Sequence, residues 1–203
     1  MRGRFIVLEG GEGCGKTSVQ GALGEAFARA HIDCLLTREP GGTELGEQVR
    51  QILLAHRAVG DPLAELLLFE AARAHLVSTV IRPALERHEV VLCDRFTASS
   101  VAYQGFGRGL GRDLVERANA IATGGLEPDL VLLLDLPVEL GLARRAGDGA
   151  SNHFDQETVA FHERVRAGFL ELAHDDPDRW RIIDAAQPLH DVIEQTWQAA
   201  IAR

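Results

Sequence analysis

Lysine is almost absent from this chain of 203 residues. Of its 21 basic side chains, 20 are arginine, and the single lysine is Lys16. Basic side chains are outnumbered by 30 Asp and Glu, so the formal net charge is −9. Such a charge argues against broad, non-specific binding of nucleic acid, and no nucleic-acid partner is expected. An anionic ligand must therefore be held by a local cationic pocket.

Long apolar runs and paired cysteines are also lacking. No segment approaches the roughly 20 apolar residues that a membrane-spanning helix needs, and the apolar run after the basic start is too short for a signal peptide. The three cysteines form no CxxC pair, which predicts reduced thiols. No repeat or low-complexity linker divides the chain. We therefore expect one domain, residues 1–203, in a cytoplasmic protein with no membrane partner.

Short apolar segments alternate with helical patterns along the chain. Five segments are typical of buried strands: 4–9, 33–37, 89–94, 129–136 and 179–185. Helices are predicted after the first strand to about Ala30, over 44–55, from Asp61 and Pro62 to a bend or end at Pro83, and over 189–202. Apolar strands separated by helices predict a parallel sheet that is covered on both faces. In such sheets ligands bind beyond the carboxyl ends of the strands.

The stretch "GGEGCGKT" follows the first predicted strand directly and precedes a helix. Gly10, Gly15, Lys16 and Thr17 satisfy the pattern G-x-x-x-x-G-K-[ST] in that context. Glycines let the backbone N–H groups surround phosphate oxygens, lysine places a compact charge on the β- and γ-phosphates, and the threonine hydroxyl ligates Mg²⁺. Arginine's planar fork is a poor substitute for such a point charge.

This motif predicts a nucleoside triphosphate and Mg²⁺ as ligands. Together with the five predicted strands, it narrows the fold class to α/β, of the three-layer α/β/α P-loop NTPase type, with a five-stranded parallel sheet. The predicted cofactor-binding residues are Gly10, Gly11, Glu12, Gly13, Cys14, Gly15, Lys16 and Thr17. A GTPase switch is excluded, because its Asn-Lys-x-Asp signature requires a second lysine.

Two further strand ends carry charged loops. "TREPGGT" (37–43) follows the second strand, and "CDRFTASSVAYQGFGRG" (93–109) follows the third. The latter places Asp94 and Arg95 at the edge of the sheet. Asp94 is suited to bind Mg²⁺ or to accept a proton from the phosphate acceptor, and Arg95 to hold a phosphate through two hydrogen bonds.

Together with "LLLFEAARAHL" (66–76) and "DAAQPL" (184–189), these motifs resemble thymidylate kinases of the bacterial type, essentially from end to end. The resemblance implies ATP-dependent phosphorylation of thymidine 5′-monophosphate (dTMP) to the diphosphate, with Mg²⁺, in a homodimer. It also implies an acceptor site. In that site Arg38 and Arg95 hold the phosphate, Phe69 stacks on thymine, Arg73 reaches a base oxygen, Tyr103 and Gln104 line the sugar and base, Ser99 and Ser100 lie near the base, and Glu9 faces the sugar or the metal.

The same resemblance implies a lid at about 144–154. Glu12 matches the class in which the lid supplies a catalytic arginine, so Arg144 or Arg145 is expected to stabilise the transferred phosphoryl group, with His153 assisting when protonated. Asp148 and His153 stand where relatives commonly have further arginines. The implied catalytic set is Lys16, Asp94, Arg95, Arg144 and Arg145, and the implied metal ligands are Thr17 and Asp94.

Purely structural roles for some of these residues, and two alternative functions, stay open at this point. Phe69 and Tyr103 are compatible with core packing, and Arg38 and Arg95 with surface ion pairs. Glu70 occupies a position where many relatives have an aromatic residue, which leaves the shape of the base pocket undefined. Because thymine differs from uracil by one methyl, worth only about 1–3 kcal/mol, a kinase for another pyrimidine nucleotide is an alternative. A catalytically weak nucleotide-binding relative is another.

Overall fold

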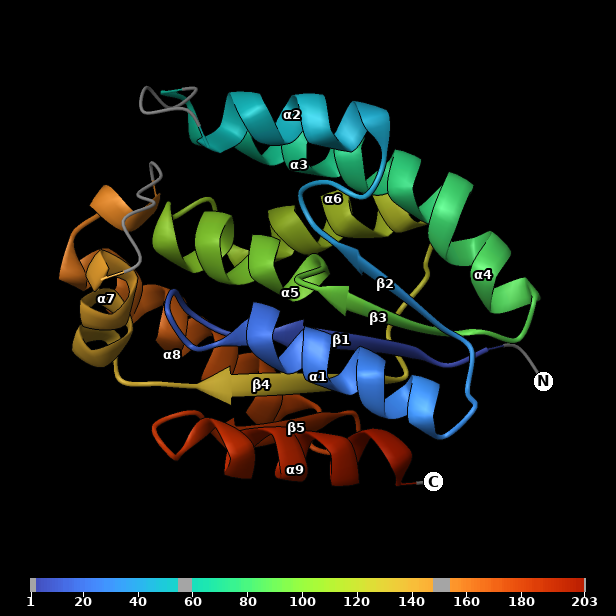
Figure 1. The fold of residues 1–203 in the computed structure, drawn as a ribbon. Coiled ribbons are helices and arrows are strands. Elements are labelled where there is room, and N and C mark those ends of the chain that lie inside the picture. The colour runs from blue at the N-terminus through green and yellow to red at the C-terminus, as the bar shows by residue number, and fades with distance from the viewer. Residues whose placement is uncertain (1–2, 55–59, 148–153, 203) are drawn as a thin grey trace.

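The computed structural model describes residues 3–54, 60–147 and 154–202. Its five strands form one parallel sheet in the order β2-β3-β1-β4-β5 (Figure 1). Their bounds are Phe5–Glu9 for β1, Cys34–Arg38 for β2, Val90–Asp94 for β3, Leu130–Asp135 for β4 and Trp180–Asp184 for β5. All five predicted strands are confirmed, and the fully buried β1 occupies the centre of the sheet.

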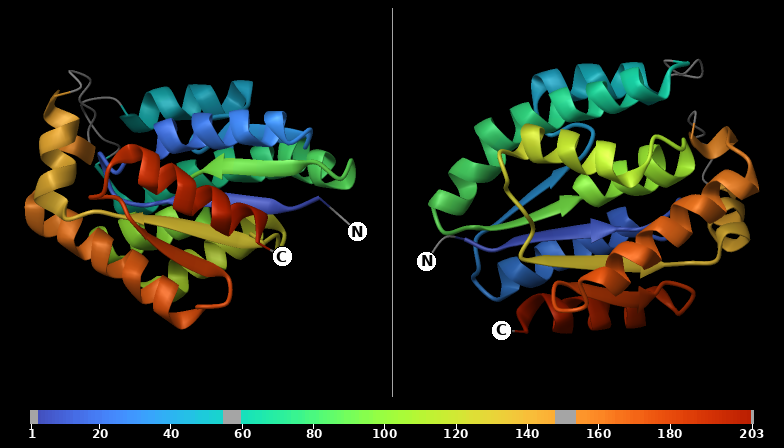
Figure 2. Two further views of the ribbon diagram at one scale, coloured as in Figure 1. Left: turned by 60° about the horizontal axis from the view of Figure 1, so that its bottom comes forward. Right: turned by 180° about the vertical axis from the view of Figure 1, so that it is seen from behind.

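Helices cover both faces of this sheet, as Figures 1 and 2 show. The α-helices are α1 (Lys16–Arg29), α2 (Glu44–Leu54), α3 (Pro62–Leu76), α4 (Arg82–Glu86), α5 (Thr97–Ser100), α6 (Arg112–Thr123), α7 (Val138–Gly147), α8 (Val159–Asp175) and α9 (Leu189–Ile201). Two π-helical segments, η1 (Val77–Ile81) and η2 (Val101–Gly107), and a 3₁₀ turn, η3 (Phe154–Gln156), complete the described structure. The predicted three-layer α/β/α class is confirmed.

The alternation of side chains along β1 separates two cores. Ile6 and Leu8 point toward α1 and α9, where they pack with Leu23 of α1. Val7 points to the other face and packs under η1 and α4. On that same face, α8 covers β4 and β5. Because the three central strands, β3, β1 and β4, are apolar on both faces, polar side chains gather at the ends of these strands.

The long helix after Asp61 begins as predicted but does not stop at Pro83. The Asp61 side chain accepts a hydrogen bond from the Ala64 N–H at 2.8 Å, and Pro62 occupies the first turn. The helix then widens into the π-helical η1 and continues through Pro83 to Glu86. The proline lies in the first turn after the π-helical segment, where its missing N–H is tolerated.

The stretch after β3 is helical rather than a loop, which corrects the sequence interpretation. From Thr97 to Gly107 it forms α5 and η2, and Ser99, Ser100, Tyr103 and Gln104 all lie on it. Its small and polar residues carry little helical signal. In the described ranges, none of the helices combines the length and apolar composition that crossing a lipid bilayer requires.

Candidate active site

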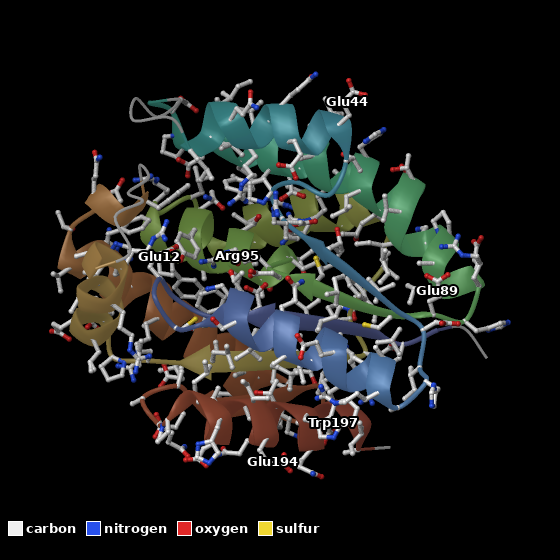
Figure 3. The ribbon with its side chains drawn as sticks, in the orientation of Figure 1. Glu12, Glu44, Glu89, Arg95, Glu194 and Trp197 are labelled. Atoms are coloured by element: carbon white, nitrogen blue, oxygen red, sulfur yellow. The ribbon has the colours of Figure 1, made fainter. Side chains whose placement is uncertain are left out.

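A cavity of about 510 Å³ lies beyond the carboxyl ends of β1, β2 and β3. In Figure 3, Glu12 and Arg95 lie on this side of the molecule and Glu89 on the opposite side. Sixteen of the residues predicted for the site line it: Glu12, Gly13, Cys14, Gly15, Lys16, Thr17, Arg38, Phe69, Arg73, Asp94, Arg95, Ser99, Ser100, Tyr103, Gln104 and Arg145. Glu9, Gly10, Gly11 and Arg144 do not. The fold therefore collects residues from positions 12 to 145 around one space.

The predicted phosphate loop connects β1 to α1 as expected. Gly15 precedes α1 with a φ of +90°, a conformation that favours glycine. Gly13 is packed so closely that an added Cβ would lie 2.1 Å from the carbonyl oxygen of Gly141 in α7. Lys16 is buried, and its Nζ donates hydrogen bonds to the Gly10 and Gly11 carbonyl oxygens at 3.0 and 2.8 Å. Thr17 is exposed toward the cavity.

Arg95 links the phosphate loop to η2. Its Nη1 donates to the Gly10 carbonyl oxygen at 3.0 Å, and its Nη2 donates to Glu12 Oε1 at 3.0 Å and to the Tyr103 hydroxyl at 3.2 Å. The Tyr103 hydroxyl in turn donates to Glu12 at 2.7 Å. Burial favours the protonated form of Glu12, but the charges of Arg95 and Lys16 outweigh it and hold the pKa of this carboxyl at about 2. Glu12 is thus an anion between two cations.

Glu9 lies beneath this cluster, fully buried. One of its oxygens accepts hydrogen bonds from the Phe96 and Ser99 N–H groups at 2.9 and 3.1 Å, and the other accepts from the Ser99 hydroxyl at 2.6 Å. Burial raises the pKa of Glu9. Both oxygens therefore hold the start of α5, and the contact of Glu9 with a sugar or metal stays a prediction.

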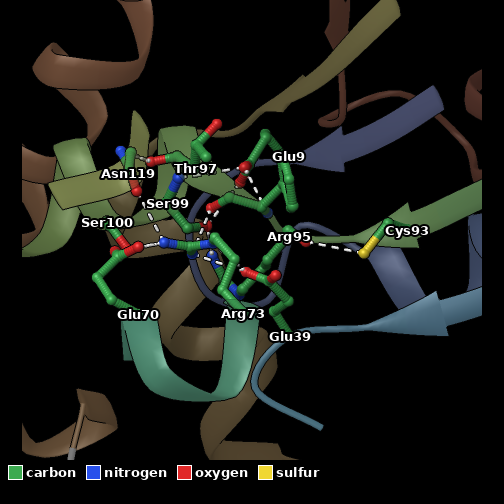
Figure 4. Close-up of polar contacts among 11 residues, drawn as sticks. Glu9, Glu39, Glu70, Arg73, Cys93, Arg95, Thr97, Ser99, Ser100 and Asn119 are labelled. Carbon is green, nitrogen blue, oxygen red and sulfur yellow. Dashed lines mark hydrogen bonds and ion pairs between the residues drawn. The ribbon is translucent and has the colours of Figure 1, made fainter. Parts of the chain in front are cut away.

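Arg73 is the centre of a second buried cluster (Figure 4). Its side chain is only 1% exposed. The partners of its guanidinium are the carboxylates of Glu39 and Glu70, the Ser100 hydroxyl, the Asn119 amide oxygen and the Phe96 carbonyl. Two carboxylates thus share one cation, and burial raises the pKa of Glu39 to about 7 despite the neighbouring Arg73.

Sequence reasoning missed these partners of Arg73. Glu39 Oε1 and Glu70 Oε2 are buried and have no hydrogen-bond partner among the residues that the structure describes. Phe69 lies one turn before Arg73 on α3, and its ring centroid is 6.3 Å from that of Phe154. It lines the cavity and packs against the core at its edge, so its stacking on a base stays a prediction.

Arginines of β2 and α2, Arg38 and Arg50, also line the cavity. Arg38 donates to both carboxylate oxygens of Glu47, at 3.0 and 3.1 Å, so it does form an ion pair as well as facing the cavity. Arg50 of α2 was not foreseen, because no local motif marks it. Its Nη1 donates to the Pro40 carbonyl oxygen at 2.9 Å, and burial, reinforced by the charge of Arg38, lowers its pKa.

The two predicted lid arginines end α7 but take different directions. Arg144 Nη1 donates to the carbonyl oxygen of Ala185, in the "DAAQPL" segment, at 3.0 Å. Arg145 lines the cavity. Asp148 and His153 lie outside the described residues. Only Arg145 of the two therefore faces the cavity, a distinction that the sequence could not make.

A buried lysine on a glycine loop between a central strand and a helix, at the carboxyl edge of a parallel sheet, defines a P-loop nucleotide-binding protein. Comparison with known proteins specifies the kind. The family model described as thymidylate kinase matches residues 8–196. The chain therefore belongs to the thymidylate kinase family.

Individual relatives agree with this assignment over nearly the whole chain. It is 53% identical to the thymidylate kinase of Thermosynechococcus vestitus, over 98% of this chain and 87% of that protein. It is 48% identical to the thymidylate kinase of Deinococcus radiodurans, over 100% and 98% respectively. Among solved structures, thymidylate kinase from Ehrlichia chaffeensis matches with a TM-score of 0.80 and 32% identity, over 98% of this chain and 99% of that one.

Proposed function

We propose that this chain phosphorylates dTMP to dTDP with ATP, in the synthesis of dTTP for DNA. The observation that carries this proposal is one cavity with two unlike ends, on the fold of the thymidylate kinase family. The P-loop end holds Lys16 and Arg95, and the α3 end holds Phe69, Arg73 and Gln104. An ATP on the P-loop would direct its γ-phosphate at a nucleotide whose base lies against α3.

At the phosphate end, each cation has a separate role in this proposal. Lys16 turns its ammonium from the loop carbonyls to the β- and γ-phosphates of ATP. Arg95 and Arg38, with Arg50 beside them, hold the phosphate of dTMP through paired N–H donors. Arg145 neutralises charge on the phosphoryl group in transfer, because it is the lid arginine that lines the cavity.

The thymidylate kinase family uses ATP and a divalent metal. We infer that the metal is Mg²⁺. Thr17 and Asp94 both line the cavity, and their oxygen donors are of the kind that Mg²⁺ prefers. In the described ranges no three His, Cys, Asp or Glu side chains converge as a metal cluster, which fits an ion held mainly by phosphates and water. Once bound, it would supply positive charge beside the transferred group.

We further propose a homodimer of a single P-loop kinase domain, 1–203, with its lid at about 144–154, in the cytoplasm. The support for the dimer is an apolar surface on two packed helices. Leu63 and Leu67 lie one turn apart on α3 and are 45% and 56% exposed, and Ile121 on the neighbouring α6 is 85% exposed. Burial of these side chains between two copies would remove them from water. Analytical ultracentrifugation of the chain and of Leu67→Glu tests this.

A coupled assay of ADP release tests the catalytic proposal. Release must depend on added dTMP, and dTMP must compete successfully with dUMP and dCMP. No dependence on dTMP would identify a binding protein, and a preference for another pyrimidine nucleotide would identify a different kinase. Arg145→Ala is expected to lower kcat by about 10²–10³-fold, with Arg144→Ala as the matched comparison. If both variants keep near-normal turnover, the lid assignment is wrong.

A further inference from the structure

Glu65 of α3 belongs to the same helix face as the residues assigned to the base. It lies four residues before Phe69 and eight before Arg73, so all three side chains project from neighbouring turns on one side of α3. Glu65 is only 4% exposed, although glutamate is rarely buried without a strong partner. No motif singled it out.

Two neighbours hold the Glu65 carboxylate. Its Oε1 accepts a hydrogen bond from the Gln104 side-chain Nε2 at 2.8 Å. The guanidinium of Arg108 donates to both oxygens, from Nε to Oε1 and from Nη2 to Oε2, each at 3.2 Å. Arg108 also bonds Glu157 and lies over the ring of Phe161 at 4.8 Å. Glu65 is therefore fixed in place independently of Gln104.

This arrangement determines which way the Gln104 amide faces. A carboxylate paired with arginine can only accept hydrogen bonds, so the NH₂ group of Gln104 must point to Glu65. The carbonyl oxygen at the other end of the amide is then directed away from Glu65. Gln104 lines the cavity, and no donor among the described residues is bonded to that oxygen. The cavity thus receives an acceptor at this position and not a donor.

We propose that Glu65 is a positioning residue that orients the Gln104 amide and thereby selects pyrimidines that carry an N3–H. This inference rests on the proposed function, in which Gln104 contacts the base. Thymine and uracil present an N3–H donor to the carbonyl oxygen, whereas cytosine presents a lone pair at N3. Two acceptors that face each other repel and leave a buried group unpaired, which disfavours cytosine.

The test measures kcat/KM for dUMP and dCMP in the wild-type enzyme, Glu65→Gln, Gln104→Ala and the double variant. Both substrates lack the thymine methyl, so the size of the base is held constant. Glutamine at position 65 can donate or accept, which frees the Gln104 amide to turn over. We expect Glu65→Gln to lower the dUMP-to-dCMP ratio at least about 10-fold, the equivalent of one lost hydrogen bond. Glu89→Gln, a half-buried carboxylate that pairs with Arg87 on the side of the molecule opposite Glu12 and Arg95, is the matched control and should leave the ratio unchanged.

The double variant shows whether Glu65 acts through Gln104. In the Gln104→Ala background, Glu65→Gln is expected to change the ratio no further, because no amide remains to be oriented. An unchanged ratio in Glu65→Gln, or an equal fall with and without Gln104, overturns the proposal while the phosphorylation of dTMP stands. If Glu65→Gln does not fold, Gln104→Ala alone decides, since an unchanged ratio there also overturns it. A wild-type enzyme inactive on dTMP would instead refute the proposed function.

Discussion

Glu12 and Glu39 line the same cavity, and each is bonded to an arginine, yet their pKa values are displaced in opposite directions. The pKa of Glu12 is lowered to about 2, and that of Glu39 is raised to about 7. Burial acts on both in the same sense, so the neighbours make the difference. Glu12 has two cations, Arg95 and Lys16, whereas Glu39 shares Arg73 with a second carboxylate.

The difference shows that the two ends of the cavity carry opposite charge balances. Cations exceed carboxylates at the P-loop end, which suits the phosphates of two nucleotides. Carboxylates exceed cations around Arg73, where the proposed ligand is a neutral ring. A nucleotide that entered with its phosphate toward α3 would meet Glu39 and Glu70. The field of the site therefore favours one orientation of the substrate.

The largest effect is expected from Lys16, at the cationic end. Lys16→Arg keeps the positive charge but cannot place it as a compact ammonium among the loop carbonyls, so kcat should fall about 10³-fold, close to Lys16→Ala. Steady-state kinetics measures this. Arg29→Lys, at an exposed position on α1, controls for the exchange of the two cations. Wild-type turnover in Lys16→Arg would show that the P-loop end of the cavity requires only a positive charge at position 16, whatever its shape.

The next largest effect is expected on stability, when the cation Arg73 is removed from the α3 end of the cavity. Arg73→Leu leaves Glu39 and Glu70 buried without a counter-ion. We therefore expect the free energy of unfolding, measured in urea, to fall by about 3–5 kcal/mol. Arg95→Leu should cost less stability, because Lys16 still faces Glu12, and should act mainly on kcat/KM for dTMP. An equal fall in the free energy of unfolding of Arg73→Leu and Arg95→Leu would contradict the difference in charge balance between the two ends of the cavity.

The raised pKa of Glu39 predicts a pH dependence of stability. Below pH 4.5 the carboxyl is protonated in both the folded and the unfolded chain. As the pH rises from 4.5 to about 7 the unfolded chain releases a proton that the native state keeps, so the free energy of unfolding falls. The slope from this group reaches about 1.4 kcal/mol per pH unit. Urea titrations between pH 4.5 and 7.5 should show a weaker slope in Glu39→Gln. An identical slope would mean that Glu39 is ionised in the native state.

Glu12 should give a smaller effect of the opposite sign. Its lowered pKa stabilises the fold above pH 4.5, and this contribution is lost as the pH falls toward 2. The side chain is 16% exposed, so water weakens the interaction. Glu12→Gln is expected to reduce the acid sensitivity of unfolding below pH 4.5. Greater acid sensitivity in this variant would contradict the conclusion that Arg95 and Lys16 lower the pKa of Glu12.

The sheet and the P-loop could be predicted from sequence because their signals are local. Apolar runs marked the strands to within a residue or two, and Asp61 with Pro62 marked the start of α3. The contacts of Arg73 could not be predicted in this way. Asn119 lies 46 residues from it and Glu39 lies 34 residues before it, and only tertiary packing brings them together.

The helical course of residues 97–107 was missed for a similar reason. The donors at its start are satisfied by Glu9, some 90 residues earlier in the chain, in place of a local capping side chain. Local rules for helix ends therefore had nothing to detect. The resemblance supplied residues such as Phe69 and Gln104 but said nothing of what orients them, and Glu65 and Arg50 became visible only in three dimensions.

The contact between Gly13 and Gly141 has a mechanical consequence. A Cβ on Gly141 would lie 2.3 Å from the Glu12 carbonyl oxygen, so here the two main chains touch directly. No side chain lies between them to absorb a displacement. A shift of the P-loop must therefore be matched by a shift of α7, whose Arg145 lies one turn beyond Gly141. A triphosphate that displaced the loop would therefore also displace the arginine that we assign to phosphoryl transfer.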